Sequence, residues 1–363
     1  MRTKTDLAQR QALPLEAKVT MSLNRIREWY QYYGGDVFVS FSGGKDSTVL
    51  AHLVHSIYPD VPLVFSNTGL EFPEIQSFAR SEGATFLRPK MMFSEVISKY
   101  GYPIISKENA DVIYGARKIF NGSKKPRAGY GQKRSNENGD YLNCRRKMLH
   151  GIAPFDHGMF EKKKWLPLAR DTFFPISHYC CNVMKKDPLS KYEKQSKSKP
   201  IIGVLALESA SRERTWIKYG CNAFDNKHPT SQPLAFWTEQ DIIDYIMLNK
   251  LDICSVYGEV SKEGFSGYNR TGCIFCCFGC HLEKGETRFQ RLAKTHPRQY
   301  EYCLGGGQWV DNPNYDEFAP EYDDFWKNWN PKKIWVPSKE GLGMKFVFDC
   351  CNEIYGKGFI RYE

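Results

Sequence analysis

Short apolar runs alternate with amphipathic stretches along the N-terminal part of the chain. Residues 36–41, 62–66 and 85–87 are rich in β-branched and aromatic side chains and predict buried parallel strands. Residues 46–57 and 72–82, which lie between them, have the apolar spacing of helices. Strands that alternate with helices predict an α/β fold with a doubly wound parallel sheet, whose ligand should bind at the carboxyl ends of the strands.

The pattern extends to both sides of this region. Leu23, Ile26, Trp29 and Tyr30 recur at helical spacing and predict a helical lead-in over residues 1–35. Later segments predict a buried strand over 201–207 and helices over 238–249, over 283–303 with a break near Pro297, and over about 341–356.

The turn after the first predicted strand carries the clearest chemical signal. It reads Ser42-Gly43-Gly44-Lys45-Asp46-Ser47 and leads directly into a predicted helix. Two glycines allow a tight turn whose N–H groups point at an anion, and the helix N-terminus and the lysine add positive charge. The spacing differs from that of a Walker A loop. We therefore predict a phosphate site, against the alternative of a glycine-rich turn that only connects strand to helix.

This turn resembles the Ser-Gly-Gly-x-Asp-Ser loop of the ATP pyrophosphatases, a superfamily with an adenine nucleotide alpha hydrolase-like, Rossmann-like fold. Four further segments resemble motifs of the phosphoadenosine phosphosulfate (PAPS) reductase family and follow one another in the family's order. These segments are residues 66–74, 180–188, 203–212 and 233–242. The resemblance spans roughly residues 36–303. It implies a nucleotide-binding α/β domain over 36–235, followed by a mostly helical, cysteine-rich C-terminal region over 236–363.

Three departures from the reductase pattern bear on function. Asn67 replaces the usual Asp, and Leu205 stands where sulfonucleotide reductases have an Arg that helps to hold the anionic substrate. The reductases' Glu-Cys-Gly-Leu-His tail is absent, and Cys303 is the nearest candidate for its nucleophile. Such a nucleophile must be an exposed, activated thiolate. The chain therefore looks more like the non-reductase branch, which includes ATP-pyrophosphatase components of DNA phosphorothioation systems and phage-type proteins.

The resemblance implies a role for each site residue. Lys45 neutralises charge that develops on the leaving pyrophosphate, Asp46 orients the loop or binds Mg²⁺, and Arg212, a catalytic candidate, faces the phosphates or the substrate. The remaining candidates surround the ATP: Ser40, Ser42, Gly43, Gly44 and Ser47 hold the phosphates, Asn67, Thr68 and Gly69 line the base and ribose, and Lys185, Glu208 and Arg214 face the phosphates or the substrate.

The implied reaction is adenylation of a substrate with release of pyrophosphate, after which sulfur displaces AMP. A cysteine desulfurase is the kind of donor that would supply the sulfur. Two alternatives are a sulfonucleotide reductase that produces sulfite and a non-catalytic accessory protein that binds nucleic acid in a nucleotide-dependent way. The oligomeric state, a homodimer among the options, stays open.

Twelve cysteines are many for a chain with no secretory segment and no apolar run of about 18 residues that could span a membrane. We expect a cytoplasmic protein in which cysteines serve metal or redox chemistry. Cys180-Cys181 and Cys273-x-x-Cys276 resemble the pairs that hold a 4Fe–4S cluster in the family. Zinc on these residues with His281 is the alternative, as is a cluster in which Cys144, Cys277 or Cys280 replaces a ligand. Cys221, Cys254 and Cys303 are read as packing cysteines.

Positive charge suggests a polyanionic partner. The net charge is +10, and basic clusters concentrate between residues 117 and 199, including Arg145-Arg146-Lys147 and a predicted loop over 121–140. We expect this segment to bind nucleic acid, either DNA or tRNA. The competing interpretation is that these charges lie on solvated surface.

Overall fold

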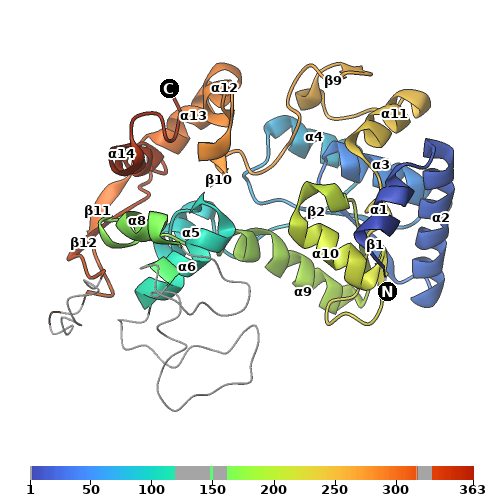
Figure 1. The fold of residues 1–363 in the computed structure, drawn as a ribbon, viewed down its shortest axis with the longest axis horizontal. Helices are drawn as coiled ribbons and strands as arrows, with labels where there is room; N and C mark the ends of the chain where they lie inside the picture. The colour runs from blue at the N-terminus through green and yellow to red at the C-terminus, as the bar shows by residue number, and fades with distance from the viewer. Residues whose placement is uncertain (1, 119–147, 150–161, 316, 318–328) are drawn as a thin grey trace, which may run out of the picture. The chain divides into compact units, whose positions relative to one another are not determined.

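The computed structural model describes residues 2–118, 148–149, 162–315, 317 and 329–363, and these form two compact units (Figure 1). Unit 1 consists of Met1–Lys90 and Val183–Ile274, and unit 2 of Met91–Asn182 and Phe275–Glu363. Each unit is therefore built from two separate stretches of chain. This differs from the expected linear division at residues 35 and 235, because residues 91–182 join the C-terminal part of the chain and not the nucleotide-binding domain.

A six-stranded sheet forms the centre of unit 1. Its order is β3-β2-β1-β5-β7-β6, and every pairing is parallel except that of the edge strand β6 with β7. The chain order reverses between β1 and β5, which is the position where doubly wound sheets bind their ligands. The strands are β1 (Val37–Phe41), β2 (Leu63–Ser66), β3 (Thr85–Leu87), β5 (Lys199–Ile202), β6 (Asn222–Ala223) and β7 (Thr230–Ser231).

Helices cover both faces of this sheet, as the doubly wound prediction requires. Phe38 and Phe41 lie on opposite faces of β1, because side chains alternate along a strand. The Phe38 ring lies 5.1 Å from Tyr192, and the Phe41 ring lies 6.2 Å from Phe78. The helices of unit 1 are α1 (Lys4–Gln11), α2 (Leu15–Tyr32), α3 (Lys45–His55), α4 (Pro73–Ser81), α9 (Asp187–Ser196), α10 (Ala210–Tyr219) and α11 (Glu239–Asn249).

One predicted strand ends earlier than the apolar run. β5 stops at Ile202, and residues Ala206–Glu208 form a 3₁₀ turn, although the run continues to Leu207. The cause is the close approach of Gly203 to α3, where an added Cβ would lie 2.9 Å from the Asp46 carbonyl oxygen. The chain has to turn at this point so that the segment after β5 can pass the start of α3.

Unit 2 is mostly helical with short strand pairs. β4 (Ile104–Ile105) pairs in parallel with β10 (Cys277–Phe278), which joins the two stretches of the unit. β11 (Gln308–Asp311) and β12 (Lys333–Val336) form a separate antiparallel pair. The helices are α5 (Phe93–Tyr100), α6 (Lys107–Lys118), α8 (Leu166–Arg170), α12 (Arg288–Thr295), α13 (Pro297–Leu304) and α14 (Met344–Tyr355). The break between α12 and α13 confirms the one predicted near Pro297.

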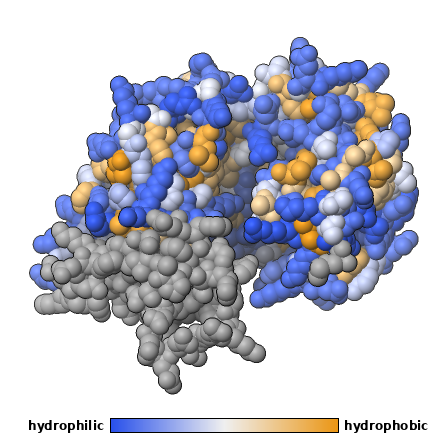
Figure 2. All heavy atoms as spheres, viewed as in Figure 1, coloured by the Kyte–Doolittle hydropathy of each residue, from blue (hydrophilic) through white to orange (hydrophobic). Residues whose placement is uncertain are grey.

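The face drawn in Figure 2 is largely polar, with apolar residues in small separate groups. Within the described ranges, no helix combines the length and the apolar character needed to cross a bilayer. The predicted loop over 121–140, the cluster Arg145-Arg146-Lys147 and Cys144 lie outside the described residues.

Candidate functional site

The predicted phosphate loop joins the end of β1 to the start of α3, at the point where the strand order reverses. Ser40 is still part of β1, whereas Ser42, Gly43 and Gly44 make the turn. Gly43 has a φ of +68°, and a Cβ there would lie 2.9 Å from Ile75 Cγ2, so only glycine fits without strain. Lys45, Asp46 and Ser47 form the first turn of α3.

The two serine hydroxyls of the loop are bonded to the loop itself. Ser47 Oγ donates to the Gly44 carbonyl at 2.8 Å and accepts from the Ser42 N–H at 3.2 Å. The Oγ atoms of Ser42 and Ser47 lie 3.0 Å apart. These bonds brace the turn, so the side chains predicted to hold phosphate also preorganise the backbone around it.

Lys45 is buried and lies between two carboxylates. Its Nζ is 3.1 Å from Asp46 Oδ1 and 3.4 Å from Glu239 Oε1, and its side chain is 6% exposed. An ammonium group has three N–H donors, so two carboxylate neighbours leave one for another acceptor. The Asp46 carboxylate therefore lies beside the lysine ammonium in the first turn of α3. Glu239 was not among the residues expected here, since it opens a helix far along the chain.

The segment after β5 reaches the same edge of the sheet. Gly203 contacts the first turn of α3, and Arg212 of α10 lies near Asp46, whose charge favours the protonated guanidinium. Burial and the neighbouring Arg270 lower the pKa of Arg212. Arg212 pairs with Glu208, which also accepts the Leu205 N–H at 3.1 Å. The predicted residues Glu208 and Arg212 are therefore brought to the loop.

Arg214 lies differently from Arg212. The two residues are separated by two positions in α10, so their side chains point to different faces of the helix. Arg214 is exposed. The structure thus brings one of the two predicted arginines of this helix to the phosphate loop.

The segment after β2 is organised by a buried carboxylate. Glu71 accepts the Thr68 hydroxyl at 2.7 Å and the Thr68 N–H at 3.1 Å, and Lys185 Nζ lies 4.0 Å away. Asn67 Oδ1 accepts the Gly69 N–H at 3.1 Å, which closes a turn at the end of the strand. The predicted residues Asn67, Thr68, Gly69 and Lys185 therefore gather around Glu71, which the sequence-based site did not include.

The features that a reductase needs differ in this chain. Leu205 is 4% exposed and brings no charge to the segment after β5. Cys303 is fully buried and its Sγ lies 3.5 Å from Met344 Sδ. Burial raises the pKa of this thiol far above its ordinary value. Because a nucleophilic cysteine must be accessible and easily deprotonated, Cys303 does not fit that role.

The predicted metal ligands are divided between the units. Cys180, Cys181 and Cys276 belong to unit 2, whereas Cys273 is near the end of unit 1. The charge of Cys181 acts on Cys276, whose pKa is raised mainly by burial. Among the described residues, no group of three or more His, Cys, Asp or Glu side chains is arranged to hold a metal ion.

The alternative ligands and packing cysteines are buried. Burial raises the pKa of Cys280 to about 12, and Cys277 lies against Met344 at 3.5 Å. Cys221 and Cys254 are buried, as expected of packing cysteines.

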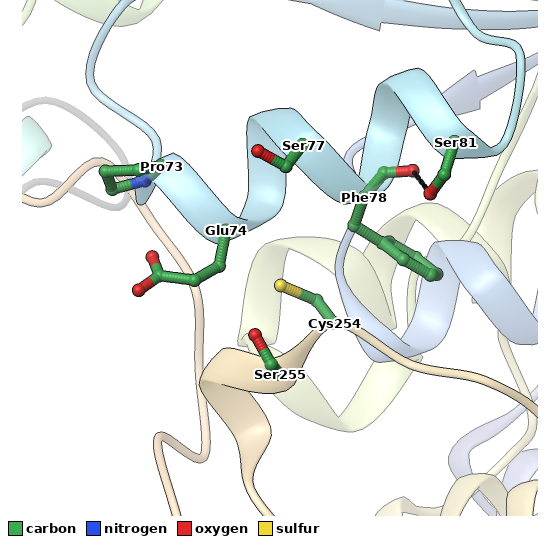
Figure 3. A pocket seen from close by; sticks show the side chains of 7 residues that line it. All are labelled: Pro73, Glu74, Ser77, Phe78, Ser81, Cys254 and Ser255. Carbon is green, nitrogen blue, oxygen red and sulfur yellow. Dashed lines mark hydrogen bonds between the residues drawn. The ribbon is translucent and has the colours of Figure 1, made fainter.

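A surface pocket of about 500 Å³ lies beside α4 (Figure 3). In Figure 3, Cys254 and Ser255 face Glu74 and Ser77 of the helix. None of the predicted site residues lines it; the lining residues are Pro73, Glu74, Ser77, Phe78, Ser81, Cys254 and Ser255. Burial, reinforced by Glu74, raises the pKa of the Cys254 thiol, so this cysteine is not an activated nucleophile.

Part of the described basic segment is buried or paired with carboxylates. Arg117 is buried and donates to the carbonyl oxygens of Leu168, Ala169 and Phe174 at 2.8–2.9 Å. It therefore cannot line a groove for nucleic acid, contrary to the expectation for a segment starting at this residue. Four other cations of the segment pair with carboxylates: Lys162 with Glu108, Arg170 with Asp171, Lys185 with Glu71 and Lys199 with Glu193.

A known protein family matches the segments that form this site. The family described as "Phosphoadenosine phosphosulfate reductase domain" matches residues 36–87 and 142–278, just over half of the chain. The chain belongs to this family. Its matched segments contain the phosphate loop, the Glu71 turn and the segment after β5.

Individual relatives are more distant. An uncharacterized protein of Methanocaldococcus jannaschii is 23% identical over 294 residues, covering 80% of this chain and 51% of the relative. An adenosine 5'-phosphosulfate reductase of Staphylococcus haemolyticus is 32% identical over 108 residues, 28% of this chain and 44% of that one. The chain thus spans about half the length of these relatives. A phosphoadenylyl-sulfate reductase from Candida auris, solved as a phosphate complex, has a TM-score of 0.35 at 11% identity, covering 75% of this chain and 98% of that one.

Proposed function

We propose that this PAPS reductase-family chain is an ATP pyrophosphatase that adenylates a substrate and so activates it for sulfur transfer. The observation that carries the proposal is the braced Ser-Gly-Gly-Lys-Asp-Ser loop at the reversal point of a parallel sheet. Buried Lys45 and the Arg212–Glu208 pair lie at this loop, as phosphate binding requires. Membership of the PAPS reductase family supports nucleotide binding. The burial of Cys303 argues against a reaction in which this thiol is the nucleophile.

The residues act by position and charge. The loop amides and Lys45 stabilise negative charge on the phosphates, and Asp46 holds Lys45 in place. Arg212 lies near Asp46 and stabilises charge on the phosphates. The turn around Glu71 presents Asn67 and Thr68 to the nucleoside. Adenylation makes a poor oxygen leaving group a good one, so that sulfur can displace AMP.

Incubation with α-labelled ATP tests this function. We expect labelled AMP with equimolar pyrophosphate in the presence of a competent acceptor. Lys45→Ala should lower ATP affinity about tenfold or more, because a charge-assisted contact of about 1.5–3 kcal/mol is removed. Lys4→Ala is a suitable control, since this lysine is 76% exposed and pairs with Glu213 only. Unchanged ATP affinity in Lys45→Ala would contradict the proposal.

A sulfonucleotide reductase is the second candidate, and the similarity to the adenosine 5'-phosphosulfate reductase of Staphylococcus haemolyticus favours it. This candidate predicts sulfite release from adenosine 5'-phosphosulfate with a thioredoxin-type donor. We expect none, because Cys303 is buried and the segment after β5 offers Leu205 in place of an arginine. Sulfite production that is lost in Cys303→Ser would reverse the order of the two candidates. A non-catalytic, nucleotide-dependent accessory protein would release neither AMP nor sulfite.

An iron–sulfur cluster on Cys180, Cys181, Cys273 and Cys276 is a separate proposal, and no step of the reaction depends on it. The donor chemistry supports it, since soft thiolates suit such clusters. The described residues bring together Cys181 and Cys276 but no group of three. Anaerobically prepared protein with about four irons per chain would support the cluster. Stoichiometric zinc without iron would support the zinc alternative.

Nucleic acid as the substrate, and a cysteine desulfurase as the sulfur donor, are also proposals. The net charge of +10 supports nucleic acid as a substrate, although buried Arg117 cannot contact it. Binding to DNA or tRNA should weaken steeply with salt, because neutralised phosphates release counterions. An anisotropy titration at low salt that gives no binding at about 10 µM protein would contradict nucleic acid as the partner, since non-specific dissociation constants are near 10⁻⁴–10⁻⁶ M even at physiological salt.

A further inference from the structure

A second segment of unit 1 lies directly against the phosphate loop. The Tyr257 hydroxyl accepts the Lys45 N–H at 3.1 Å and lies 2.7 Å from Thr271 Oγ1. A Cβ on Gly44 would lie 3.2 Å from that hydroxyl and 3.3 Å from Thr271 Oγ1. Residues 255–271, which we call the 255–271 arm, therefore touch both the last glycine of the loop and the first amide of α3.

The arm is built to hold Tyr257 in this position. It contains a turn at Ser255–Tyr257 and a short hairpin of β8 (Val260–Ser261) and β9 (Gly264–Phe265). The Gly267 N–H donates to the Tyr257 carbonyl at 2.8 Å, and a Cβ on Gly267 would lie 2.4 Å from the Val256 carbonyl oxygen. Tyr257 is 2% exposed, and burial raises its pKa to about 12, so it stays a neutral hydroxyl near neutral pH.

Arg270 precedes the anchored Thr271 and is exposed. Lys45 pairs with Asp46 and Glu239, and Arg212 pairs with Glu208, so each of these two cations has at least one carboxylate beside it. For Arg270, no carboxylate of the described residues lies within 4.0 Å, and its charge acts on Arg212. Within the described ranges, Arg270 thus offers a guanidinium with no carboxylate beside it, a group well suited to phosphate.

We propose that the 255–271 arm forms a wall of the phosphate site, in which Arg270 binds the phosphate chain of the nucleoside triphosphate and Tyr257 and Thr271 position the arm. This inference rests on the proposed function, because it assumes that the Ser42–Ser47 loop binds the phosphates of ATP. It adds a binding residue and two positioning residues that neither the family's motifs nor the loop sequence assign.

Calorimetric titration with inorganic pyrophosphate tests the binding residue. Arg270→Gln should weaken pyrophosphate about tenfold or more, as expected when a charge-assisted contact is lost. Lys262→Gln removes the same charge from an exposed position of the same arm and should leave affinity within about twofold. Equal affinity of Arg270→Gln and the unchanged chain, an equal loss in Lys262→Gln, or no pyrophosphate binding by the unchanged chain would each overturn the inference.

A double-mutant cycle tests the positioning residues. In a Thr271→Val background, where the anchor to Tyr257 is lost, Arg270→Gln should cost clearly less affinity than it does alone. Additive losses would contradict a positioning role for Thr271. Tyr257→Phe keeps the ring that packs 5.3 Å from Phe265 and should lower pyrophosphate affinity while the protein stays folded.

The two proposals fail in different ways. If pyrophosphate binds through Arg270 but α-labelled ATP gives no AMP, the proposed function is wrong and the role of the 255–271 arm in phosphate binding is supported. If ATP is cleaved and Arg270→Gln binds and cleaves it like the unchanged chain, the role of Arg270 is wrong and the proposed function is supported.

Discussion

At the scale of single residues, Gly44 is the point where the phosphate loop and the 255–271 arm leave little room for a side chain. A Cβ there would lie 3.2–3.3 Å from Ser42 Oγ, the Tyr257 hydroxyl and Thr271 Oγ1. We expect Gly44→Ala to weaken ATP binding modestly and Gly44→Val to weaken it at least tenfold, because overpacking costs about 1–3 kcal/mol. Nucleotide affinity measured by calorimetry checks both variants.

Gly272→Ala provides the matched control for this prediction. An added Cβ at Gly272 meets no atom within 4 Å, so nucleotide affinity should not change. If Gly44→Val bound ATP as tightly as Gly272→Ala, the turn would be a connection between strand and helix and not a phosphate site.

Arg117 illustrates how a charged residue can serve the interior. It donates to three carbonyl oxygens and to Thr172 Oγ1, and its guanidinium lies 4.1 Å from the centre of the Trp329 ring. Burial lowers its pKa well below the ordinary value. Arg117→Met should lower the free energy of unfolding by roughly 3–5 kcal/mol, because buried carbonyls lose their donors. Chemical denaturation measures this change.

The exposed pair of Arg170 and Asp171 provides the comparison. Arg170 Nε donates to Asp171 Oδ1 at 2.7 Å, but the arginine side chain is 44% exposed. Arg170→Met should change stability by less than about 1 kcal/mol. A loss in Arg117→Met that is no larger than this would mean that its hydrogen bonds are not needed for folding.

At the scale of elements, a buried ion pair ties α2 to α11. Lys18 Nζ lies 2.7 Å from Asp241 Oδ2 and is 3% exposed, while Asp241 also caps α11 through Thr238. Lys18→Met should destabilise unit 1 by roughly 3–5 kcal/mol, because it leaves a buried carboxylate without its partner. It should also weaken ATP binding, since α11 begins with Glu239, which contacts Lys45.

Thermal unfolding and nucleotide titration of the same preparation check both effects. Lys4→Met serves as the control, because its pair with Glu213 is 3.1 Å long but exposed and should contribute less than about 1 kcal/mol. A Lys18→Met protein as stable as Lys4→Met would show that the pair does not hold α11 in place.

At the scale of the whole molecule, the cysteines of unit 2 separate into buried and accessible groups. Cys277, Cys303 and Cys351 are 0% exposed, whereas Cys181 and Cys276 are partly accessible. Burial raises the pKa of each of the three buried thiols, so thiolate is scarce at pH 8 and becomes common only at much higher pH or after unfolding. Iodoacetamide should therefore modify none of the three in the native protein.

Peptide mapping by mass spectrometry after native and denaturing alkylation checks this prediction. Cys181 should react before the buried group in metal-free protein, because its side chain is accessible. Rapid native modification of Cys303 would contradict its burial and would restore it as a candidate nucleophile.

The local elements and the residue types of the loop can be predicted from the sequence alone. The strand before the loop, the helix after it and the break at Pro297 follow from side-chain periodicity and from glycine and proline, which act over a few residues. Side-chain periodicity predicted a strand that extends to residue 207, but β5 ends at Ile202. The reason is not local, because Gly203 packs closely against the first turn of α3. The helix α10 escaped prediction since its Trp216 is its one buried residue.

Tertiary structure decided which distant residues complete the site. The Lys45 amide meets a hydroxyl 212 positions away, and Lys18 meets a carboxylate 223 positions away. It also decided that Arg117 lies in the interior and that the chain forms two units from four stretches. Sequence patterns report which face of an element is buried, but they do not report what lies against it. Distant residues such as Glu239, Tyr257 and Arg270 reach the loop because later segments of the chain return to the same edge of the sheet. The course of those segments depends on how all the elements pack together.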